Sequence, residues 1–579
     1  MTDKIKYIIF GLLLPFLAQA QTPEQIFQAV GTPANPKVNI SFNRYYTAEG
    51  LEALAKKLAE AHPDLITLQS IGKSYEGRDL WCMTVTDQRT GPDLEKPGFY
   101  IDGNIHSNEI QGSEFAMYTA WYLAESYGKN EFITELLKEK VFYIVPTINP
   151  DARNAYMKGE NTANTPRSGM IPIDDDRDGV YDEDGYDDLN GDGEITQMRR
   201  QSPYGDYIVD PVNPNRMIRV EPDERGTYEY LGTEGIDNDG DGQINEDRVG
   251  GYYDANRNWG WNWQPEYIQR GSHYYPFSVP ENRAVMEFVL DHPNIAGAQS
   301  YHNTGGMLLR GPGAEEDRGT YSRADIQVYD QLGELGEKLI PGYRYLTVYK
   351  DLYSVFGGEL DWFHGGRGVF TFTNELYTSY LMFHDRERSR EDMDLFGEKL
   401  LFNDQLVKWE EYDHPTYGKI EIGGTRKTFG RNDPGFLLET DAHRNMAFTI
   451  YHAYQTPKLV IEDVVEKDLG NGYRQVTASV GNQRIIPTHS DHDLKNKISP
   501  PDFVSIQGVE VVAGMRLRNL DLNQADEQEF RPERIAVDNI PGMSRVYVRW
   551  IVKADAKSPY TIRVESAKGG VVTKEVQGN

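Results

Sequence analysis

The first part of the chain alternates between helical and extended hydrophobic patterns. Residues 48–61 place apolar side chains three and four positions apart, which predicts an amphipathic helix. Apolar runs typical of strands follow at 66–71, 80–86 and 99–103, and residues 112–125 again show helical spacing. Strands that alternate with helices predict an α/β fold, with a mixed sheet covered by helices.

Four of the apolar segments end in polar, reactive residues. These residues are His106, the Asn149-Pro150-Asp151 turn, His302 and Glu375. Functional side chains of α/β proteins gather at the carboxyl ends of strands. We therefore expect these residues to meet at one edge of the sheet.

The pattern then predicts further parts of the chain. Gly, Asp and Asn interrupt the alternation, and we interpret residues 171–250 as an insertion in a catalytic domain that spans 21–410. Helical spacing ends near Trp409, and residues 411–455 are predicted to form a bridging β segment.

The last part of the chain is β-rich. Strand patterns occur at 458–464, 474–480, 508–512 and 544–551, separated by turn residues. They predict a C-terminal β-sandwich over residues 456–579.

The N-terminus predicts export. Lys4 and Lys6 precede an apolar run that ends in Ala18-Gln19-Ala20, which is the pattern of a cleavable signal peptide over residues 1–20. The mature protein is then expected to be secreted or periplasmic. No later stretch has the roughly 20 apolar residues of a membrane-spanning helix. The single cysteine, Cys82, excludes an intramolecular disulfide and is expected to be a buried apolar side chain.

The charge is strongly acidic and uneven. A formal net charge of -30 argues against a nucleic acid as partner. Residues 174–194 hold eleven acidic side chains against one Arg, and residues 237–247 hold five more. This local concentration requires a local cause.

The acidic insertion contains three loops that begin like calcium-binding loops, D-x-[DN]-x-D-G. None carries the bidentate Glu at position twelve of a complete EF-hand. We predict structural calcium there, and a merely solvated acidic loop is the alternative. The candidate ligands are Asp174, Asp176, Asp178, Asp188, Asn190, Asp192, Asp237, Asp239 and Asp241.

A His and a Glu three residues apart can face one metal ion, and this spacing occurs twice. His384 and Glu387 lie in a charged run without an adjoining strand, so we interpret them as a solvated face. His106 and Glu109 follow a buried strand instead. Catalytic zinc takes three protein ligands and keeps a fourth position for water, and His302 is the best placed third ligand.

Several further segments make the chain similar to the zinc carboxypeptidases, the carboxypeptidase A type of metallopeptidase. They are 71–78, 254–259 (Asp-Ala-Asn-Arg-Asn-Trp), 353–362 and 370–375 (Phe-Thr-Phe-Thr-Asn-Glu). The resemblance covers about residues 40 to 400 without the insertion, and its motifs occur in the same order as in the family.

The resemblance implies a role for each matching residue. His106, Glu109 and His302 would bind zinc, and Asp254 would orient a zinc-binding histidine. Glu375 would act as general base on the zinc-bound water.

Substrate-binding roles are implied in the same way. Asn256 and Arg257 would bind the free C-terminal carboxylate of a peptide, for which a planar Arg fork is suited. Tyr353 would close over the bound end of the peptide. Leu360, at the base of the specificity pocket, predicts apolar or aromatic C-terminal residues, although the neighbouring Glu359 could supply an acid instead.

Other positions are less well defined by the resemblance. The arginine that stabilises the oxyanion is assigned to Arg167, with Arg153 as the alternative. Asn108 replaces an Arg of the digestive members. Asn374 stands where an aromatic residue is usual, and it should point away from Glu375 because strand neighbours alternate faces.

We therefore predict an exported zinc metallocarboxypeptidase that acts on peptides with a free C-terminal carboxylate. One alternative is a zinc hydrolase of cell-wall peptides or N-acyl amino acids, which loss of the Asn256-Arg257 pair would favour. Another is an inactive, calcium-stabilised binding protein. The presence of Glu375 together with three metal ligands argues against inactivity.

Overall fold

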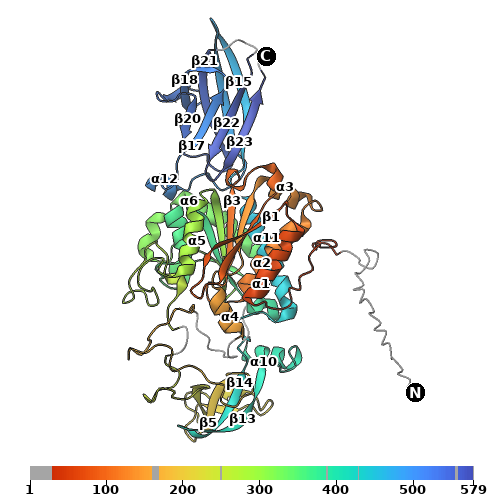
Figure 1. Cartoon of the computed structure of the whole chain (residues 1–579), viewed down its shortest axis with the longest axis vertical. Helices are drawn as coiled ribbons and strands as arrows, with labels where there is room; N and C mark the ends of the chain where they lie inside the picture. The colour runs from red at the N-terminus through yellow and green to blue at the C-terminus, as the bar shows by residue number, and fades with distance from the viewer. Residues whose placement is uncertain are drawn as a thin grey trace, which may run out of the picture.

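The computed structural model describes residues 29–158, 168–247, 251–385, 389–427, 429–553 and 558–577. The predicted signal peptide (1–20), Arg167 and Glu387 lie outside these ranges. Figure 1 shows three parts stacked along the long axis of the molecule: a C-terminal β region at the top, an α/β region in the middle and a small β region at the bottom.

An eight-stranded mixed sheet forms the centre of the α/β region. Its first four strands in spatial order are β1 (Ile66–Lys73), β2 (Asp79–Val85), β4 (Val141–Val145) and β3 (Gly98–Gly103). The remaining four are β9 (Ile295–Asn303), β12 (Phe370–Leu376), β10 (Met307–Arg310) and β11 (Arg344–Thr347). Strands β4, β3, β9 and β12 run parallel, so their carboxyl ends share one edge.

Helices cover both faces of this sheet. Helices α1 (Ala48–Ala61), α2 (Gln111–Ser126) and α11 (Gly435–Tyr454) pack in one hydrophobic cluster, and α6 (Arg323–Leu339) contacts α11. Helix α5 (Pro280–Asp291) lies against β1 within a second cluster. The predicted mixed α/β sheet covered by helices is confirmed, and α1 has the predicted bounds.

Local sequence explains why α2 can approach the sheet closely. Gly112 lies against β9, and a Cβ atom at this position would come 2.8 Å from the backbone oxygen of Tyr301. Since Tyr301 precedes His302, this close approach fixes the end of β9 relative to the start of α2. Cys82 is fully buried in β2, as expected.

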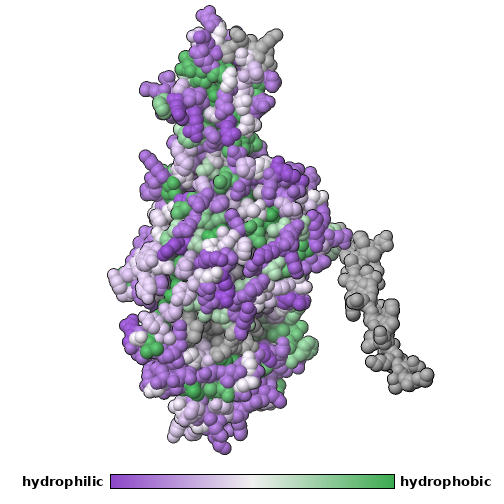
Figure 2. Space-filling view, in the orientation of Figure 1, coloured by the Kyte–Doolittle hydropathy of each residue, from purple (hydrophilic) through white to green (hydrophobic). Residues whose placement is uncertain are grey.

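The insertion forms a sheet with a later hairpin. Its strand order is β13-β14-β5-β8-β6-β7. The insertion supplies β5 (Gln197–Gln201), β6 (Tyr207–Val209), β7 (Met217–Arg219) and β8 (Tyr228–Thr233). The hairpin supplies β13 (Leu406–His414) and β14 (Gly418–Thr425). Side chains on this lower part are mostly hydrophilic in the view of Figure 2.

The C-terminal part contains two antiparallel sheets that enclose one apolar cluster, consistent with the predicted β-sandwich. The five-stranded sheet holds β15 (Leu459–Gly470), β16 (Tyr473–Asn482), β21 (Ser544–Lys553), β18 (Glu510–Asn519) and β19 (Gln524–Glu527). The four-stranded sheet holds β20 (Arg534–Val537), β17 (Asp502–Gln507), β22 (Tyr560–Ser566) and β23 (Gly570–Val576).

Two secondary-structure predictions are wrong. Trp409 lies in strand β13 rather than near the end of a helix, and the helix before it, α10 (Arg390–Lys399), ends earlier. The segment 411–455 is not β throughout, because residues 435–454 form the long helix α11 against the central sheet. Buried polar side chains in α11, among them Asn445 and Thr449, hide its apolar face from a pattern analysis. Within the described ranges, no helix is long and apolar enough to cross a membrane.

Candidate functional site

Three predicted metal ligands meet at the carboxyl edge of the central sheet. The Nδ1 atom of His106 lies 2.9 Å from Glu109 Oε2, and the Nδ1 atom of His302 lies 3.0 Å from the same oxygen. The two Nδ1 atoms are 3.2 Å apart. Each of the three residues is only 1% exposed. Two histidine nitrogens and one carboxylate oxygen therefore converge on a single point.

The local backbone explains this convergence. His106 and Glu109 lie in the turn between β3 and α2, and Asn104, with a positive φ of 58°, begins that turn. The side-chain amide of Asn104 donates a hydrogen bond to the carbonyl oxygen of His106 (2.6 Å). His302 comes from the end of β9, which is the parallel neighbour of β3.

The three side chains fit a zinc ion. Zinc bonds of about 2.0–2.2 Å in tetrahedral geometry separate the ligand atoms by about 3.3 Å, close to the distances found here. The other ring nitrogen of His106 lies 2.8 Å from Asp254 Oδ1, as predicted for the residue that fixes its tautomer. The other nitrogen of His302 lies 3.5 Å from Asn256 Nδ2. Both histidines thus present Nδ1 to the same point.

Glu375 lies beside this cluster on β12. Its Cα atom pairs with that of His302 in the parallel β9–β12 ladder, and both side chains line the same cleft. Asn374 points to the opposite face, where its side-chain amide donates to Asn445 Oδ1 (3.0 Å). The structure therefore places Asn374 away from Glu375, as the alternation of strand residues predicts.

Asn256 and Arg257 lie in a short turn, Ala255–Arg257, that Asp254 caps by accepting a hydrogen bond from the Asn256 backbone N–H (2.8 Å). Asn256 Oδ1 accepts from the Glu359 backbone N–H (2.8 Å), which leaves its Nδ2 on the His302 side. The guanidinium of Arg257 donates to the Asn256 carbonyl (2.7 Å) and is 12% exposed. One turn therefore connects Asp254, whose carboxylate contacts His106, with Arg257, which lines the neighbouring cleft.

One cleft of about 260 Å³ joins these groups. Tyr353 lies in a loop at this cleft and is 58% exposed. Leu360 contributes an apolar wall together with Leu309 and Val348. The cleft is lined by these predicted site residues: His106, Asn256, Arg257, His302, Tyr353, Leu360 and Glu375.

Glu359 points away from the cleft into the protein interior. Its Oε2 lies 3.0 Å from the Ser300 hydroxyl oxygen, and that hydroxyl donates to Asp102 Oδ1 (2.5 Å). Burial, followed by the charge of Asp102, raises the pKa of Glu359 well above its ordinary value. A buried carboxyl in this state does not supply the cleft with a negative charge, so the prediction that Glu359 could replace Leu360 at the pocket is wrong.

The two arginine predictions have different outcomes. Arg167 lies outside the described residues. Arg153 is fully buried: it donates to Glu114 Oε1 (2.6 Å) and to the carbonyls of Ile110 and Tyr46 (2.8 Å each). This set of partners occupies its guanidinium, so the alternative assignment of Arg153 to the oxyanion is wrong.

Arg431 is a cleft residue that the sequence did not indicate. It follows β14, and its Nη1 lies 3.5 Å from Glu109 Oε1 and donates to the Asn303 carbonyl (3.2 Å). Its side chain is 36% exposed. Arg431 belongs to none of the motifs that carry the family resemblance, and only the packing of its loop against the zinc-site turn reveals its position.

The three acidic loops share one turn conformation. The first Asp of each loop accepts a hydrogen bond from the glycine five positions later, in the pairs Asp174–Gly179, Asp188–Gly193 and Asp237–Gly242 (2.9–3.1 Å). Carboxylates of the first and third loops come together in groups of three, among them Asp176 with Asp239 and Asp241. Among the described residues, Asp188 and Asp192 of the second loop join no such group.

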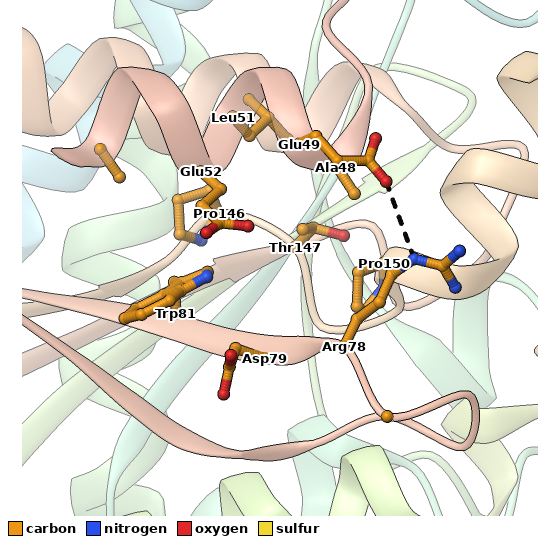
Figure 3. A pocket seen from close by; sticks show the side chains of 12 residues that line it. Ala48, Glu49, Leu51, Glu52, Arg78, Asp79, Trp81, Pro146, Thr147 and Pro150 are labelled. Carbon is orange, nitrogen blue, oxygen red and sulfur yellow. Dashed lines mark ion pairs between the residues drawn. The ribbon is translucent and has the colours of Figure 1, made fainter. Parts of the chain in front are cut away.

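A separate hollow lies between α1 and β2 (Figure 3). Glu49 and Arg78 face each other across it, 3.8 Å apart, and Trp81 and Pro150 line it. Among the described residues, no group of metal-binding side chains lies in this hollow. It therefore does not compete with the His106–His302 cleft as a catalytic site.

A mixed α/β sheet with two histidines and a glutamate converging at its carboxyl edge is the arrangement of an α/β metallohydrolase. The family profile described as zinc carboxypeptidase matches residues 51–190 and 228–392, somewhat more than half of the chain. The chain therefore belongs to the zinc carboxypeptidase family, and the resemblance inferred from the sequence is confirmed. A second profile, of a domain of unknown function, matches residues 458–577.

Individual relatives match shorter stretches. Carboxypeptidase M of Mus musculus is 36% identical over 115 residues, which are 20% of this chain and 26% of that protein. Carboxypeptidase D of Anas platyrhynchos is 28% identical over 150 residues, 26% of this chain and 10% of that protein. An inactive metallocarboxypeptidase, ECM14 of Ajellomyces capsulatus (strain H143), is 33% identical over 128 residues, 22% of this chain and 21% of that protein. The chain thus spans about a quarter or less of the length of these relatives.

Solved structures of carboxypeptidases are also similar at low identity. The crystal structure of thrombin activatable fibrinolysis inhibitor has 16% identity and a TM-score of 0.43 and covers 71% of this chain and 74% of that chain. Carboxypeptidase A from Helicoverpa armigera has 18% identity and a TM-score of 0.39, covering 58% and 66% of the two chains.

The geometry predicts that His302 is required for zinc binding. In a His302→Ala variant, zinc content measured by mass spectrometry should fall from about one ion per chain to near zero, since two ligands seldom retain catalytic zinc. The control is His384→Asn, which removes the imidazole of the other His-x-x-Glu spacing and should keep its zinc. A folded His302→Ala protein that retains one zinc would remove His302 from the site.

Proposed function

We propose that this chain is an exported zinc metallocarboxypeptidase that hydrolyses the C-terminal peptide bond of peptides. The observation that carries the proposal is the cleft itself. It brings the converging His106, Glu109 and His302 donor atoms together with Glu375 and Arg257. Metal ligands, a candidate base and a cation for a carboxylate are the groups that this reaction requires.

The chemistry divides among these groups. Zinc, when bound by His106, Glu109 and His302, supplies a Lewis acid and lowers the pKa of a coordinated water to about 7. Glu375 is the carboxylate placed to accept the proton of the attacking water and to return it to the leaving amine. Asp254 would hold His106 in the tautomer whose Nδ1 carries no proton and can bind the metal.

Recognition of the peptide end is assigned to the turn beside the metal ligands. Arg257 and Asn256 Nδ2 would bind the free C-terminal carboxylate, and the exposed Tyr353 would cover it. The apolar wall formed by Leu360, Leu309 and Val348 favours an apolar or aromatic C-terminal side chain.

The oxyanion requires a further cation near the metal ligands. The resemblance implies Arg167, and that assignment stays a prediction. Arg431 lines the described cleft and lies beside Glu109, whereas Arg257 belongs to the turn that follows Asp254. We assign to Arg431 the stabilisation of negative charge on the carbonyl oxygen of the scissile bond.

Two further parts of the proposal concern the whole protein. Export is supported by the signal-peptide pattern of residues 1–20. Calcium is proposed as a structural cofactor of the insertion, because the carboxylates of the first and third acidic loops gather into groups of three.

Glu375→Gln should separate zinc binding from catalysis. Gln has the same shape but cannot accept the proton, so kcat should fall by about 10² or more while zinc content and circular dichroism remain unchanged. Hydrolysis of a blocked dipeptide, followed by release of the C-terminal amino acid, measures this change. An unaltered kcat would show that Glu375 is not the general base.

Replacing each of the two cleft arginines should change the hydrolysis of charged and uncharged peptide ends differently. Peptides that differ only in a free or an amidated C-terminus are compared by kcat/KM. In Arg257→Met, hydrolysis of the free acid should fall about 10- to 100-fold, as expected for a lost charge-assisted hydrogen bond, with little effect on the amide. In Arg431→Met, both substrates should be affected by the same factor. Equal cleavage of acid and amide by the wild-type protein would contradict the carboxypeptidase proposal.

A further inference from the structure

The first and third acidic loops share a longer pattern than their calcium-loop start. Counting the first Asp of each loop as position one, both carry Glu at position ten and Asp at position eleven. These residues are Glu183 and Asp184 in the first loop, and Glu246 and Asp247 in the third. The second loop has Gln197 and Met198 at the same positions and lacks both acids.

The two loops are joined through these final aspartates. Asp184 and Asp247 form an isolated antiparallel bridge, with the Asp184 N–H donating to the Asp247 carbonyl (3.0 Å). The carboxylate of each aspartate also accepts a hydrogen bond from the backbone N–H at position two of the other loop. The Asp175 N–H donates to Asp247 Oδ1 (3.4 Å), and the Asn238 N–H donates to Asp184 Oδ1 (3.3 Å). The contacts of one loop are thus repeated by the other.

Each loop therefore contributes its position-eleven carboxylate to the candidate ligands of the other loop, an arrangement that we call the exchange. Asp247 of the third loop lies with Asp174 and Asp176 of the first, with their ligand oxygens all within 4.8 Å of one another. Asp184 of the first loop lies in the same way with Asp239 and Glu246 of the third. The two groups share no residue, and a third group, Asp176 with Asp239 and Asp241, lies between them and joins the two loops.

A second observation is a buried carboxylate oxygen that lacks a hydrogen-bond donor. Asp247 is 1% exposed, and its Oδ2 has no hydrogen-bond partner within the described structure. The side-chain oxygens of Glu183 and Glu246 are also shielded from solvent, and each of these carboxyls lies beside the position-eleven aspartate of one of the two loops. Burying an ionised carboxylate without a hydrogen bond or counter-charge is costly. A divalent cation in contact with these oxygens removes that cost.

Arg177 is the one basic residue within the first loop, and the third loop has none. No ion pair in the described part of the chain joins Lys or Arg to Asp174, Asp176, Asp184, Asp239 or Asp247. Like charges therefore crowd together, and a cation would relieve the repulsion.

We propose that the first and third loops form one paired calcium module that holds two calcium ions. Each ion is bound by the carboxylates of one loop together with the position-eleven aspartate of the other. Oxygen-only ligands in loops suit calcium, which accepts six to eight oxygens in variable geometry, better than magnesium, which requires a near-ideal octahedron. The inference rests on the proposed calcium cofactor and is independent of the peptidase activity.

The module adjoins the carboxylate-binding turn. The carboxylate of Asp175, at position two of the first loop, accepts hydrogen bonds from the Tyr252 N–H (3.2 and 3.3 Å). Tyr252 lies two residues before Asp254, which orients His106. Calcium would thereby stabilise the segment that leads into Asn256 and Arg257.

Two double variants with the same change of charge test the exchange in the zinc-loaded full chain. Asp174→Asn with Asp247→Asn removes ligands that the structure groups around one ion. Asp174→Asn with Asp184→Asn removes two residues of the same loop. Calcium affinity and stoichiometry are measured by competition with a chromophoric chelator, and zinc content and circular dichroism verify folding. Asp206→Asn, at an exposed position of the insertion, is the single-charge control.

The wild type and Asp206→Asn should each bind two calcium ions. The Asp174/Asp247 pair should lose one ion and keep the other within about threefold of its wild-type affinity. The Asp174/Asp184 pair should weaken both ions at least tenfold. If the Asp174/Asp184 pair instead loses one ion while the Asp174/Asp247 pair weakens both, each loop binds its own ion with its own aspartates. That result would overturn the proposal. Equal effects of the two pairs, or no calcium binding by the wild type, would overturn it as well. In any of these cases, retained zinc and peptide hydrolysis would leave the proposed peptidase standing.

Discussion

Two histidines and a glutamate are packed into one corner of the sheet edge with almost no exposure to water. Such a group is stable only if its charges and lone pairs have partners. Asp254 accepts the hydrogen bond of the outward ring nitrogen of His106, and Arg431 faces the second oxygen of Glu109. The outward ring nitrogen of His302 lies 3.5 Å from Asn256 Nδ2. What remains are three donor atoms directed at one point. The surrounding strands and loops hold these buried metal ligands in place.

The parallel ladder of β3, β9 and β12 provides the required rigidity. It sets His302 beside Glu375 and keeps both next to the turn that carries His106 and Glu109. A second set of contacts comes from the segment after the insertion sheet. Gln111, at the start of α2, binds Asp433 and Asp441 through its side-chain amide (2.8 and 3.2 Å). This contact fixes the loop that carries Arg431, so a segment beyond residue 392, where the family profile ends, completes the cleft.

The sequence predicted the α/β sheet and the groups at its edge because local patterns determine both. Apolar runs that end in His106, His302 and Glu375 are visible without tertiary contacts. Three features depend on contacts distant in sequence and could not be predicted. The buried face of helix α11 includes the polar residues Asn445, Thr449 and His452, so it does not form a continuous apolar pattern in the sequence. The contacts that bury these side chains form only in the folded protein. Strand β5 of the insertion pairs with a hairpin strand more than 220 residues later. Arg431 reaches Glu109 only through the docking of its loop.

Zinc-edge anomalous diffraction from crystals of the zinc-loaded protein tests the central claim most directly. The account predicts one strong peak of the catalytic metal, within about 2.0–2.2 Å of His106 Nδ1, His302 Nδ1 and a carboxylate oxygen of Glu109. Glu375 and Arg257 should face the same peak across the cleft. A zinc peak bound elsewhere, or bound without either histidine, would contradict the account.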